Sequence, residues 1–383
     1  MNEIVGIIGA GTMGVGIAQV ALQSGHQVIL VDSNAEQLEK AKLNLSHQLT
    51  KMVDKGIISL SDKYSFENRI QFSMNVELCS ICHLIIEAVV ENLTLKHQVF
   101  ETLEKIVSES CILASNTSSF SIASIGSVLK NPNRVIGIHF FNPAPVMPLV
   151  EIIPAIQTSS DTLRESMQII KNWGKTTLVC KDTPGFIVNR IARPFYGEAL
   201  RIYEEGIADF ATIDWAMTYF GGFKMGPFAL MDFIGNDVNY TVTESIFHSL
   251  YFDTRFKPSV IQKRYVEARF YGRKTGRGYY DYSDQINLPV PNFNEELGKK
   301  IFNRILIMLI NGAYDSIFMQ IADSKDIDLA TIKGLNFPKG LISWSNEMGL
   351  KNTLHQIQSL FDLYGEDRYR PSPLLKEICK SES

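Results

Sequence analysis

Residues 9–14, with the sequence GAGTMG, constrain the fold of this chain more than any other feature. They follow the apolar, β-branched run Glu3–Ile8, which is typical of a buried strand, and they lead into helical spacing from Thr12 to Gln23. A second apolar run begins at His26 and ends in an acid, Asp32. A strand, a glycine turn, a helix and a strand within about thirty residues predict a dinucleotide-binding βαβ unit.

Each glycine of this turn has a physical role. Gly9 allows the tight turn, Gly11 lets the backbone approach a pyrophosphate, and Gly14 lets the helix pack close to the strand. The free N–H groups and the dipole at the helix N-terminus then hold the phosphates. Asp32 is placed to accept hydrogen bonds from an adenine ribose and would repel a 2′-phosphate, which favours NAD over NADP. The predicted cofactor residues of this unit are Gly9, Ala10, Gly11, Thr12, Met13, Gly14 and Asp32.

Strands and helices continue to alternate in the first half of the chain. The patterns predict helices over 35–56 and 92–107, and strands over 83–89, 111–115, 135–141 and 149–153. Strands separated by helices indicate a parallel sheet with right-handed crossovers, whose ligands bind at the carboxyl ends of the strands.

Beyond the Asp-Thr-Pro-Gly stretch at 182–185 the pattern changes to long helices that repeat at a shift of 114 positions. The matches across this shift are Asn189-Arg190-Ile191 with Asn303-Arg304-Ile305, Ile207-Ala208-Asp209 with Ile321-Ala322-Asp323, Ile213-Asp214 with Ile327-Asp328, Phe223 with Phe337, Gly226 with Gly340, and Gly235 with Gly349. We therefore predict an α/β Rossmann-type parallel-sheet domain followed by two tandem all-α repeats. The predicted boundaries are 1–184 for the NAD-binding domain, 185–285 for the first helical domain and 297–383 for a second, truncated one, with residues 288–291 in the connection between the copies.

Composition excludes several classes of protein. A net charge of −4 argues against a protein that tracks the nucleic-acid backbone. No segment approaches about 18 uninterrupted apolar residues, and the run 305–310 is typical of a core helix. Glu3 stands where a signal peptide would be basic, and five scattered cysteines do not form a disulfide framework. We expect a cytoplasmic protein with no nucleic-acid partner, no membrane partner and no metal site.

Polar residues with catalytic chemistry follow the predicted strands. Ser115–Ser119 closes one strand, His139 closes another, and Glu151 lies in the next. Oxidation of a hydroxyl requires a base, and a histidine held by a carboxylate suits that role. Each residue also has a structural interpretation: a satisfied core histidine, a solvent-facing glutamate, or, for Ser118, the cap of a helix near Ile122. The residues alone thus predict an NAD-dependent oxidoreductase with a His139–Glu151 pair, and they leave the substrate open.

At this point the sequence resembles the L-3-hydroxyacyl-CoA dehydrogenase family. The phrases that carry the resemblance are GAGTMG (9–14), IIEAVVENLTLK (85–96), ASNTSSFSI (114–122), HFFNPAPVMPLVE (139–151), DTPGFIVNRI (182–191), MGPFALMD (225–232) and KTGRGYYDY (274–282). Two positions depart from the family pattern, Phe120 in place of Leu and Ala229 in place of Glu.

The resemblance implies reversible, NAD-dependent oxidation of an L-3-hydroxyacyl-CoA to the 3-ketoacyl-CoA. His139 would be the base and Glu151 its partner, while Ser118 and Asn189 would position the substrate. Further contacts to NAD are implied for Glu91, Lys96, Ser118, Asn142 and Lys274. Lys55 matches a position that meets CoA phosphates, although it also fits a solvated helix face.

The second helical copy is absent from the short members of this family, which dimerise through their single helical domain. We expect residues 300–380 to take the place of a partner subunit's helical domain, with further homo-oligomers left open. Two alternatives remain: a dehydrogenase of free hydroxy acids, similar to the gulonate dehydrogenase branch, and a non-catalytic scaffold that binds NAD or CoA.

Overall fold

A computed structural model describes residues 3–283 and 289–381 of this chain. The chain divides into two compact units, Met1–Phe186 and Ile187–Ser383. The predicted end of the first helical domain at residue 285, Leu288 of the predicted connection and the last two residues of the chain lie outside the described residues.

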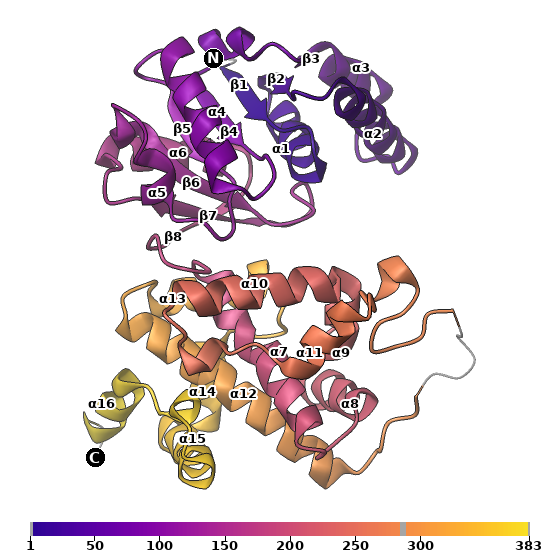
Figure 1. Cartoon of the computed structure of the whole chain (residues 1–383), viewed down its shortest axis with the longest axis vertical. Coiled ribbons are helices and arrows are strands. Elements are labelled where there is room, and N and C mark those ends of the chain that lie inside the picture. Colours follow the sequence, from indigo (N-terminus) through magenta and orange to yellow (C-terminus); the bar gives the residue numbers. More distant parts are fainter. Residues whose placement is uncertain (1–2, 284–288, 382–383) are drawn as a thin grey trace. The chain divides into compact units, whose positions relative to one another are not determined.

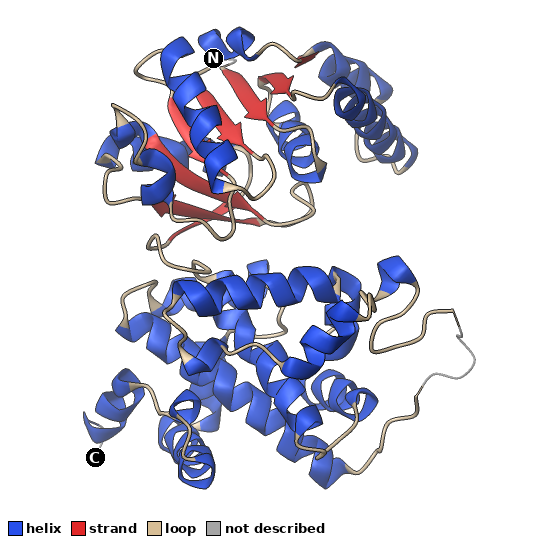
Figure 2. Ribbon diagram, in the orientation of Figure 1, coloured by secondary structure: helices blue, strands red, loops and turns tan. Residues whose placement is uncertain are grey.

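The first unit is built on one sheet with helices on both faces, as Figures 1 and 2 show. Among the described residues the strand order is β3-β2-β1-β4-β5-β6-β7-β8. The strands are β1 (Ile4–Ile8), β2 (Gln27–Val31), β3 (Ile70–Ser73), β4 (Leu84–Glu87), β5 (Ile112–Ser115), β6 (Val135–Phe140), β7 (Leu149–Pro154) and β8 (Thr176–Val179). The helices are α1 (Thr12–Gln23), α2 (Ala35–Asp54), α3 (Leu60–Asn68), α4 (Leu93–Ile106), α5 (Ile122–Gly126) and α6 (Ser160–Asn172), with 3₁₀ turns η1 (Val76–Ile81) and η2 (Pro132–Arg134). The predicted Rossmann-type fold is confirmed.

One pair of strands departs from the predicted parallel sheet, because β7 runs antiparallel to β6. Only a short loop joins these two strands, whereas a right-handed crossover to a parallel neighbour needs a dozen or more residues. The reversal has a functional consequence. It brings the start of β7 beside the carboxyl end of β6, so that Glu151 is the register partner of His139.

The core of the first unit comes from the apolar runs that define its strands. Ile7, Leu30 and Ile86 are fully buried in the sheet, and α1 covers them with Ile17 and Leu22. Burial of each such side chain contributes about 1.5–3 kcal/mol. This core fixes the ends of the strands, where the candidate site lies.

The second unit is helical among its described residues. Its elements are α7 (Val188–Glu204), α8 (Phe210–Gly221), α9 (Pro227–Ile234), α10 (Asn236–Ser249), η3 (Thr254–Phe256), α11 (Val260–Glu267), η4 (Arg273–Thr275), α12 (Glu295–Phe318), α13 (Ser324–Gly334), α14 (Leu341–Met348), α15 (Leu350–Tyr364), η5 (Asp367–Tyr369) and α16 (Pro373–Ser381). The starts of α8, α9 and α10 recur 114 positions later as the starts of α13, α14 and α15. A shift of 113 then relates α11 to α16. The predicted tandem repeat is confirmed as a repeat of helices.

Hydrogen bonds repeat along with the helices. The Asp214 carboxylate accepts from the backbone N–H groups of Phe228 and Ala229, each at 2.8 Å. The Asp328 carboxylate accepts from the N–H groups of Ile342 and Ser343 at 2.7 and 3.0 Å, which are the same positions shifted by 114. Residues that keep both identity and contact at a fixed shift indicate duplication rather than a chance similarity of heptads.

Helix α12 is long and apolar enough to cross a membrane by length and composition alone. In the structure, however, 61% of its most apolar window is buried, with Ile305 and Leu309 fully inaccessible. It packs along α7 and is the core helix predicted from the run 305–310.

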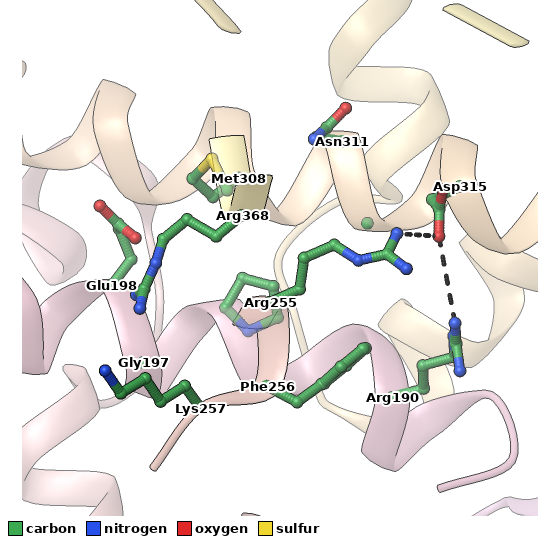
Figure 3. A pocket seen from close by; sticks show the side chains of 12 residues that line it. Arg190, Gly197, Glu198, Arg255, Phe256, Lys257, Met308, Asn311, Asp315 and Arg368 are labelled. Atoms are coloured by element: carbon green, nitrogen blue, oxygen red, sulfur yellow. Dashed lines mark hydrogen bonds and ion pairs between the residues drawn. The ribbon is translucent and has the colours of Figure 1, made fainter. Parts of the chain in front are cut away.

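A small cavity of about 40 Å³ lies between the two helical copies (Figure 3). On one wall the Arg255 guanidinium points at the carboxylate of Asp315, which also faces Arg190 at 4.0 Å. Arg255 belongs to the first copy and Asp315 to the second, so this ion pair joins the copies. The residues that line the cavity include none of the predicted catalytic or cofactor residues.

Candidate active site

The turn at residues 9–14 leaves space for a phosphate group. Gly9 has φ +107°, and a Cβ there would lie 2.6 Å from the carbonyl oxygen of Ala88. A Cβ on Gly14 would lie 1.8 Å from the carbonyl oxygen of Gly9, so only glycine allows α1 this close to the turn. Gly11, by contrast, faces open space with no atom within 4 Å of an added Cβ. No side chain caps the N-terminus of α1 and its first turn has no acid, so its N–H groups and dipole suit an anion.

Asp32 follows β2, and its carboxylate is fixed beside this turn. It accepts hydrogen bonds from the backbone N–H of Ala10 at 2.8 Å and of Asn34 at 3.0 Å. The acid therefore lies at the carboxyl end of its strand next to the glycine turn. Together the turn and the acid form a cradle that fits the pyrophosphate and the adenine ribose of NAD.

His139 and Glu151 lie opposite each other on the neighbouring strands β6 and β7, in the other half of the sheet from the glycine turn. The ring Nδ1 of His139 lies 2.7 Å from Oε2 of Glu151. Glu151 is fully buried, so the interpretation of this residue as a solvent-facing glutamate is wrong. The His139 ring also packs edge-on against Phe141, with a centroid distance of 4.6 Å. With Nδ1–H donating to the carboxylate, the lone pair of Nε2 is available to accept a proton.

A buried network that the motif analysis did not identify supports the strand ends beside this pair. Glu87 closes β4 with no exposed surface and accepts from the Lys96 ammonium at 2.8 Å and from the Ser115 hydroxyl at 2.6 Å. Asn116 ties β5 to β6 by accepting from the Phe140 N–H at 2.8 Å. The signal for Glu87 was present, since an acid that ends an apolar strand nine residues before a helical lysine can form a buried pair.

Glu91 holds the serine-rich turn that follows β5. Its Oε1 accepts from the Ser119 hydroxyl at 2.7 Å and from the backbone N–H of Ser118 at 3.2 Å, and its Oε2 lies 3.1 Å from Lys96. Burial would raise the pKa of Glu91, but Lys96 and the hydroxyls of Thr117 and Ser119 outweigh it and lower that pKa below its usual range. Lys96 is only 1% exposed between Glu87 and Glu91, so it positions this turn, and its direct contact with NAD stays a prediction.

Ser118 is not the helix cap that the structural interpretation offered. The cap of α5 is Ser121, whose hydroxyl accepts from the Ser124 N–H, and Asp182 accepts from the N–H groups of Ile122 and Ala123. The Ser118 hydroxyl makes no hydrogen bond to another described residue. It is therefore free to contact a ligand at the carboxyl end of β5.

The four remaining predicted residues lie in loops, in a 3₁₀ turn or at helix ends of the two units. Asn142 follows β6 in an exposed loop, and Lys55 is the exposed C-cap of α2. In the helical unit, Asn189 is the second residue of α7. Lys274 lies in η4 and pairs with Asp237 at 2.6 Å.

Within the first unit, then, the carboxyl edge of the sheet carries a dinucleotide cradle on one side and a carboxylate-held imidazole on the other. This combination defines the class of NAD-binding oxidoreductases. Among the residues that the structure describes, no group of three or more His, Cys, Asp or Glu side chains is arranged to hold a metal ion.

Comparisons with known proteins narrow the class to a family. Residues 4–183 match the family model of the 3-hydroxyacyl-CoA dehydrogenase NAD-binding domain. Residues 185–282 and 301–383 each match the model of the 3-hydroxyacyl-CoA dehydrogenase C-terminal domain, consistent with the duplication.

Two curated relatives illustrate the long and short forms. The chain is 33% identical to 3-hydroxyadipyl-CoA dehydrogenase of Escherichia coli (strain K12), over 100% of this chain and 98% of the relative. It is 40% identical to a probable 3-hydroxybutyryl-CoA dehydrogenase of Bacillus subtilis, over 73% of this chain and 98% of the relative.

Solved structures of dehydrogenases indicate the same family. A 3-hydroxybutyryl-CoA dehydrogenase from Escherichia coli K12 superposes with a TM-score of 0.94 at 32% identity, covering 100% of this chain and 99% of that one. An (S)-3-hydroxybutyryl-CoA dehydrogenase from Ralstonia eutropha covers 74% of this chain and 100% of its own, with a TM-score of 0.72 at 38% identity. This chain belongs to the 3-hydroxyacyl-CoA dehydrogenase family and is an NAD-dependent oxidoreductase that acts on a CH–OH group.

Proposed function

We propose that this enzyme interconverts L-3-hydroxyacyl-CoA and 3-ketoacyl-CoA with His139 as the catalytic base and Glu151 as the residue that orients it. The 2.7 Å contact between Nδ1 of His139 and Oε2 of Glu151 carries the proposal. It fixes the tautomer, because Nδ1–H donates to the carboxylate and Nε2 is left to accept the hydroxyl proton.

Charge supports the same roles. As Nε2 takes up the proton, the ring becomes an imidazolium, and the buried carboxylate of Glu151 stabilises that charge. The bound cofactor supplies the hydride acceptor for the hydrogen on C3. Ser118 donates its hydroxyl to the substrate oxygen, and the family resemblance assigns Asn189 as a further substrate-positioning residue.

The chemistry of the relatives supports an acyl-CoA substrate. The curated and solved relatives are named for 3-hydroxyadipyl-CoA and 3-hydroxybutyryl-CoA. We place the reaction in fatty-acid or related acyl-CoA metabolism in the cytoplasm, with Lys55 as a contact of the CoA phosphates.

The second helical copy takes the place that a partner subunit's helical domain occupies in the short forms. The ion pair of Arg255 and Asp315 and the packing of α7 along α12 support this assignment, since they join the copies within one chain. A crystal structure in which the first copy meets the first copy of another chain would refute it.

An NADH absorbance assay tests the reaction directly. Acetoacetyl-CoA should be reduced and free acetoacetate should not. Turnover of the free acid alone would favour a dehydrogenase of hydroxy acids, and silence with both would favour a scaffold. The variant His139→Gln should abolish turnover while NADH still binds, and near-normal activity in that variant would remove His139 from its role.

A further inference from the structure

The second helical copy carries a groove of about 390 Å³ between α15 and α16, the two C-terminal helices in Figure 1. On α15, Lys351, Leu354 and His355 share one helix face, since they are three or four positions apart. On α16, Lys376 and Lys380 are one turn apart and line the other wall. The described residues that line this groove include no carboxylate.

The first copy provides an internal reference for this groove, because α10 and α11 correspond to α15 and α16. The register is firm: Ser259 corresponds to Ser372, and the buried Gln262 to the buried Leu375. Each residue that lines the groove has a counterpart in the first copy. On α15 the counterparts are Asp237 for Lys351, Tyr240 for Leu354, Thr241 for His355 and Glu244 for Gln358. On α16 they are Lys263 for Lys376, Val266 for Cys379 and Glu267 for Lys380.

The two sets differ in charge. In the first copy three carboxylates and one ammonium give a net charge of −2, with histidine absent. In the second copy three ammonium groups and no carboxylate give +3, before any charge on His355. Solvent-exposed helix faces vary freely, but here all three lining carboxylates are lost, and two of the three become lysine on facing walls of one groove. Beside the lining, the carboxylate of Asp362 accepts a hydrogen bond from the lining residue Gln358 at 2.8 Å.

The acids of the first copy have partners within their own copy. Asp237 pairs with Lys274 at 2.6 Å, and Glu244 accepts from the Tyr240 hydroxyl at 3.0 Å. The second copy has leucine at the position of that tyrosine, so the aromatic ring is absent and the apolar side chain of Leu354 forms part of the floor beside Cys379.

We infer that the groove between α15 and α16 binds a small phosphorylated molecule, with its phosphate groups between Lys351, Lys376 and Lys380. Lysine binds phosphate as a point charge, and convergent lysines suit two or more phosphates. The N-terminus of α15 lies at the Lys351 end with no side-chain cap, and its dipole adds to the attraction. Leu354 and Cys379 offer an apolar floor to a ring. A nucleotide has this chemistry, whether free or as the phosphorylated ADP head of coenzyme A.

Isothermal titration tests the site in the full-length enzyme, with saturating NADH present so that the dinucleotide cradle is filled. The probes are ADP, for a free nucleotide, and adenosine 3′,5′-bisphosphate, for the coenzyme A head. The test variant Lys351→Asp/Lys380→Glu restores the residues of the first copy, which the same helices already accommodate. The matched control Lys299→Glu/Lys325→Asp makes the same change in charge on exposed positions of α12 and α13.

We expect one of the probes to bind the wild-type protein and the control, and to bind the test variant at least about tenfold more weakly, because two charge-assisted contacts are reversed. The probe whose affinity falls in the test variant identifies the source of the phosphate, since binding at the proposed coenzyme A contact Lys55 would stay unchanged. Dehydrogenase activity without the probe and the melting temperature should be equal in all three proteins. Equal affinity of the wild type and the test variant, or no binding of either probe, would overturn the inference. Binding only of an acidic peptide or of anionic vesicles would overturn it as well.

Discussion

The role of Glu151 can be tested by removing its charge and almost nothing else. Glutamine has nearly the same shape as glutamate, and its carbonyl can still accept the hydrogen bond from Nδ1 of His139. The pair is buried, with a contact of 2.7 Å and no exposed surface on Glu151, so the charge acts with little screening by solvent. What Glu151→Gln removes is the stabilisation of the imidazolium.

The size of the effect follows from the type of bond. A hydrogen bond to the charged glutamate contributes about 1.5–3 kcal/mol, whereas one to the neutral glutamine contributes about 0.5–1.5 kcal/mol. The variant therefore loses about 1–1.5 kcal/mol, and because each 1.36 kcal/mol corresponds to about tenfold in rate, kcat should fall by about 5- to 13-fold. The affinity for NADH should stay unchanged, because the cofactor cradle lies at the ends of β1 and β2, in the other half of the sheet from β6 and β7. The assay is steady-state reduction of acetoacetyl-CoA, with NADH binding measured separately by fluorescence.

A suitable control is Glu104→Gln. The Glu104 carboxylate accepts hydrogen bonds from the backbone N–H groups of Lys130 and Asn131 and from neither member of the His139–Glu151 pair. Its removal should leave kcat unchanged even if the melting temperature falls. A Glu151→Gln enzyme with wild-type kcat would refute the argument that the carboxylate stabilises a charged ring.

Three further predictions concern the cradle and the helical unit. Gly14→Ala should destabilise the protein by about 2 kcal/mol or more in chemical denaturation, because its Cβ would lie 1.8 Å from the carbonyl oxygen of Gly9. Gly11→Ala should change the free energy of unfolding by no more than about 0.5 kcal/mol, because its Cβ meets no atom within 4 Å, but it should weaken NADH binding. Equal effects of the two variants would contradict the assigned geometry. Asp32→Ala should shift the ratio of kcat/KM for NADPH over NADH upward by about tenfold or more, and an unchanged ratio would show that this acid does not select the cofactor. Burial raises the pKa of Asp214 from 3.8 to about 7, so between these pH values the folded protein holds a proton that the unfolded chain releases. In this range the contribution of Asp214 to the free energy of unfolding therefore falls by about 1.4 kcal/mol for each unit that the pH rises. Asp214→Asn should remove that contribution from the pH dependence of unfolding, and parallel curves for the two proteins would contradict the shift.

Strong, local patterns gave reliable predictions of the fold. The apolar runs around Ile7, Leu30 and Ile86 became central strands, and the glycine turn became the start of α1. The strands β3 and β8 and the helices α3 and α6 were not predicted. The two strands and α3 are short and mostly half-exposed, so they lack the apolar run or the helical period that a single sequence reveals. In α6 the buried residues are Thr162, Ser166 and Ile170, so two of the three are polar and the buried face gives little apolar signal.

The candidate site was predictable only in part, for a related reason. His139 and Glu151 could be singled out by residue type and position, but their contact depends on β7 reversing direction, which is a property of the short loop before it. The supporting network of Glu87, Lys96 and Glu91 depends on three-dimensional proximity that no spacing rule specifies. The catalytic and cofactor roles of the residues singled out stay predictions until the variants are measured.

The ion pair between Arg255 and Asp315 shows what joining two copies in one polypeptide allows. A subunit that pairs with an identical subunit must accept every substitution twice, once on each side of the axis. The position in the first copy that corresponds to Asp315 is Arg201, so a self-paired first copy would set one guanidinium against another. In a fused pair each half can change without the same change in the other, so an acid in one half can face a base in the other where a two-fold axis would otherwise impose identical residues.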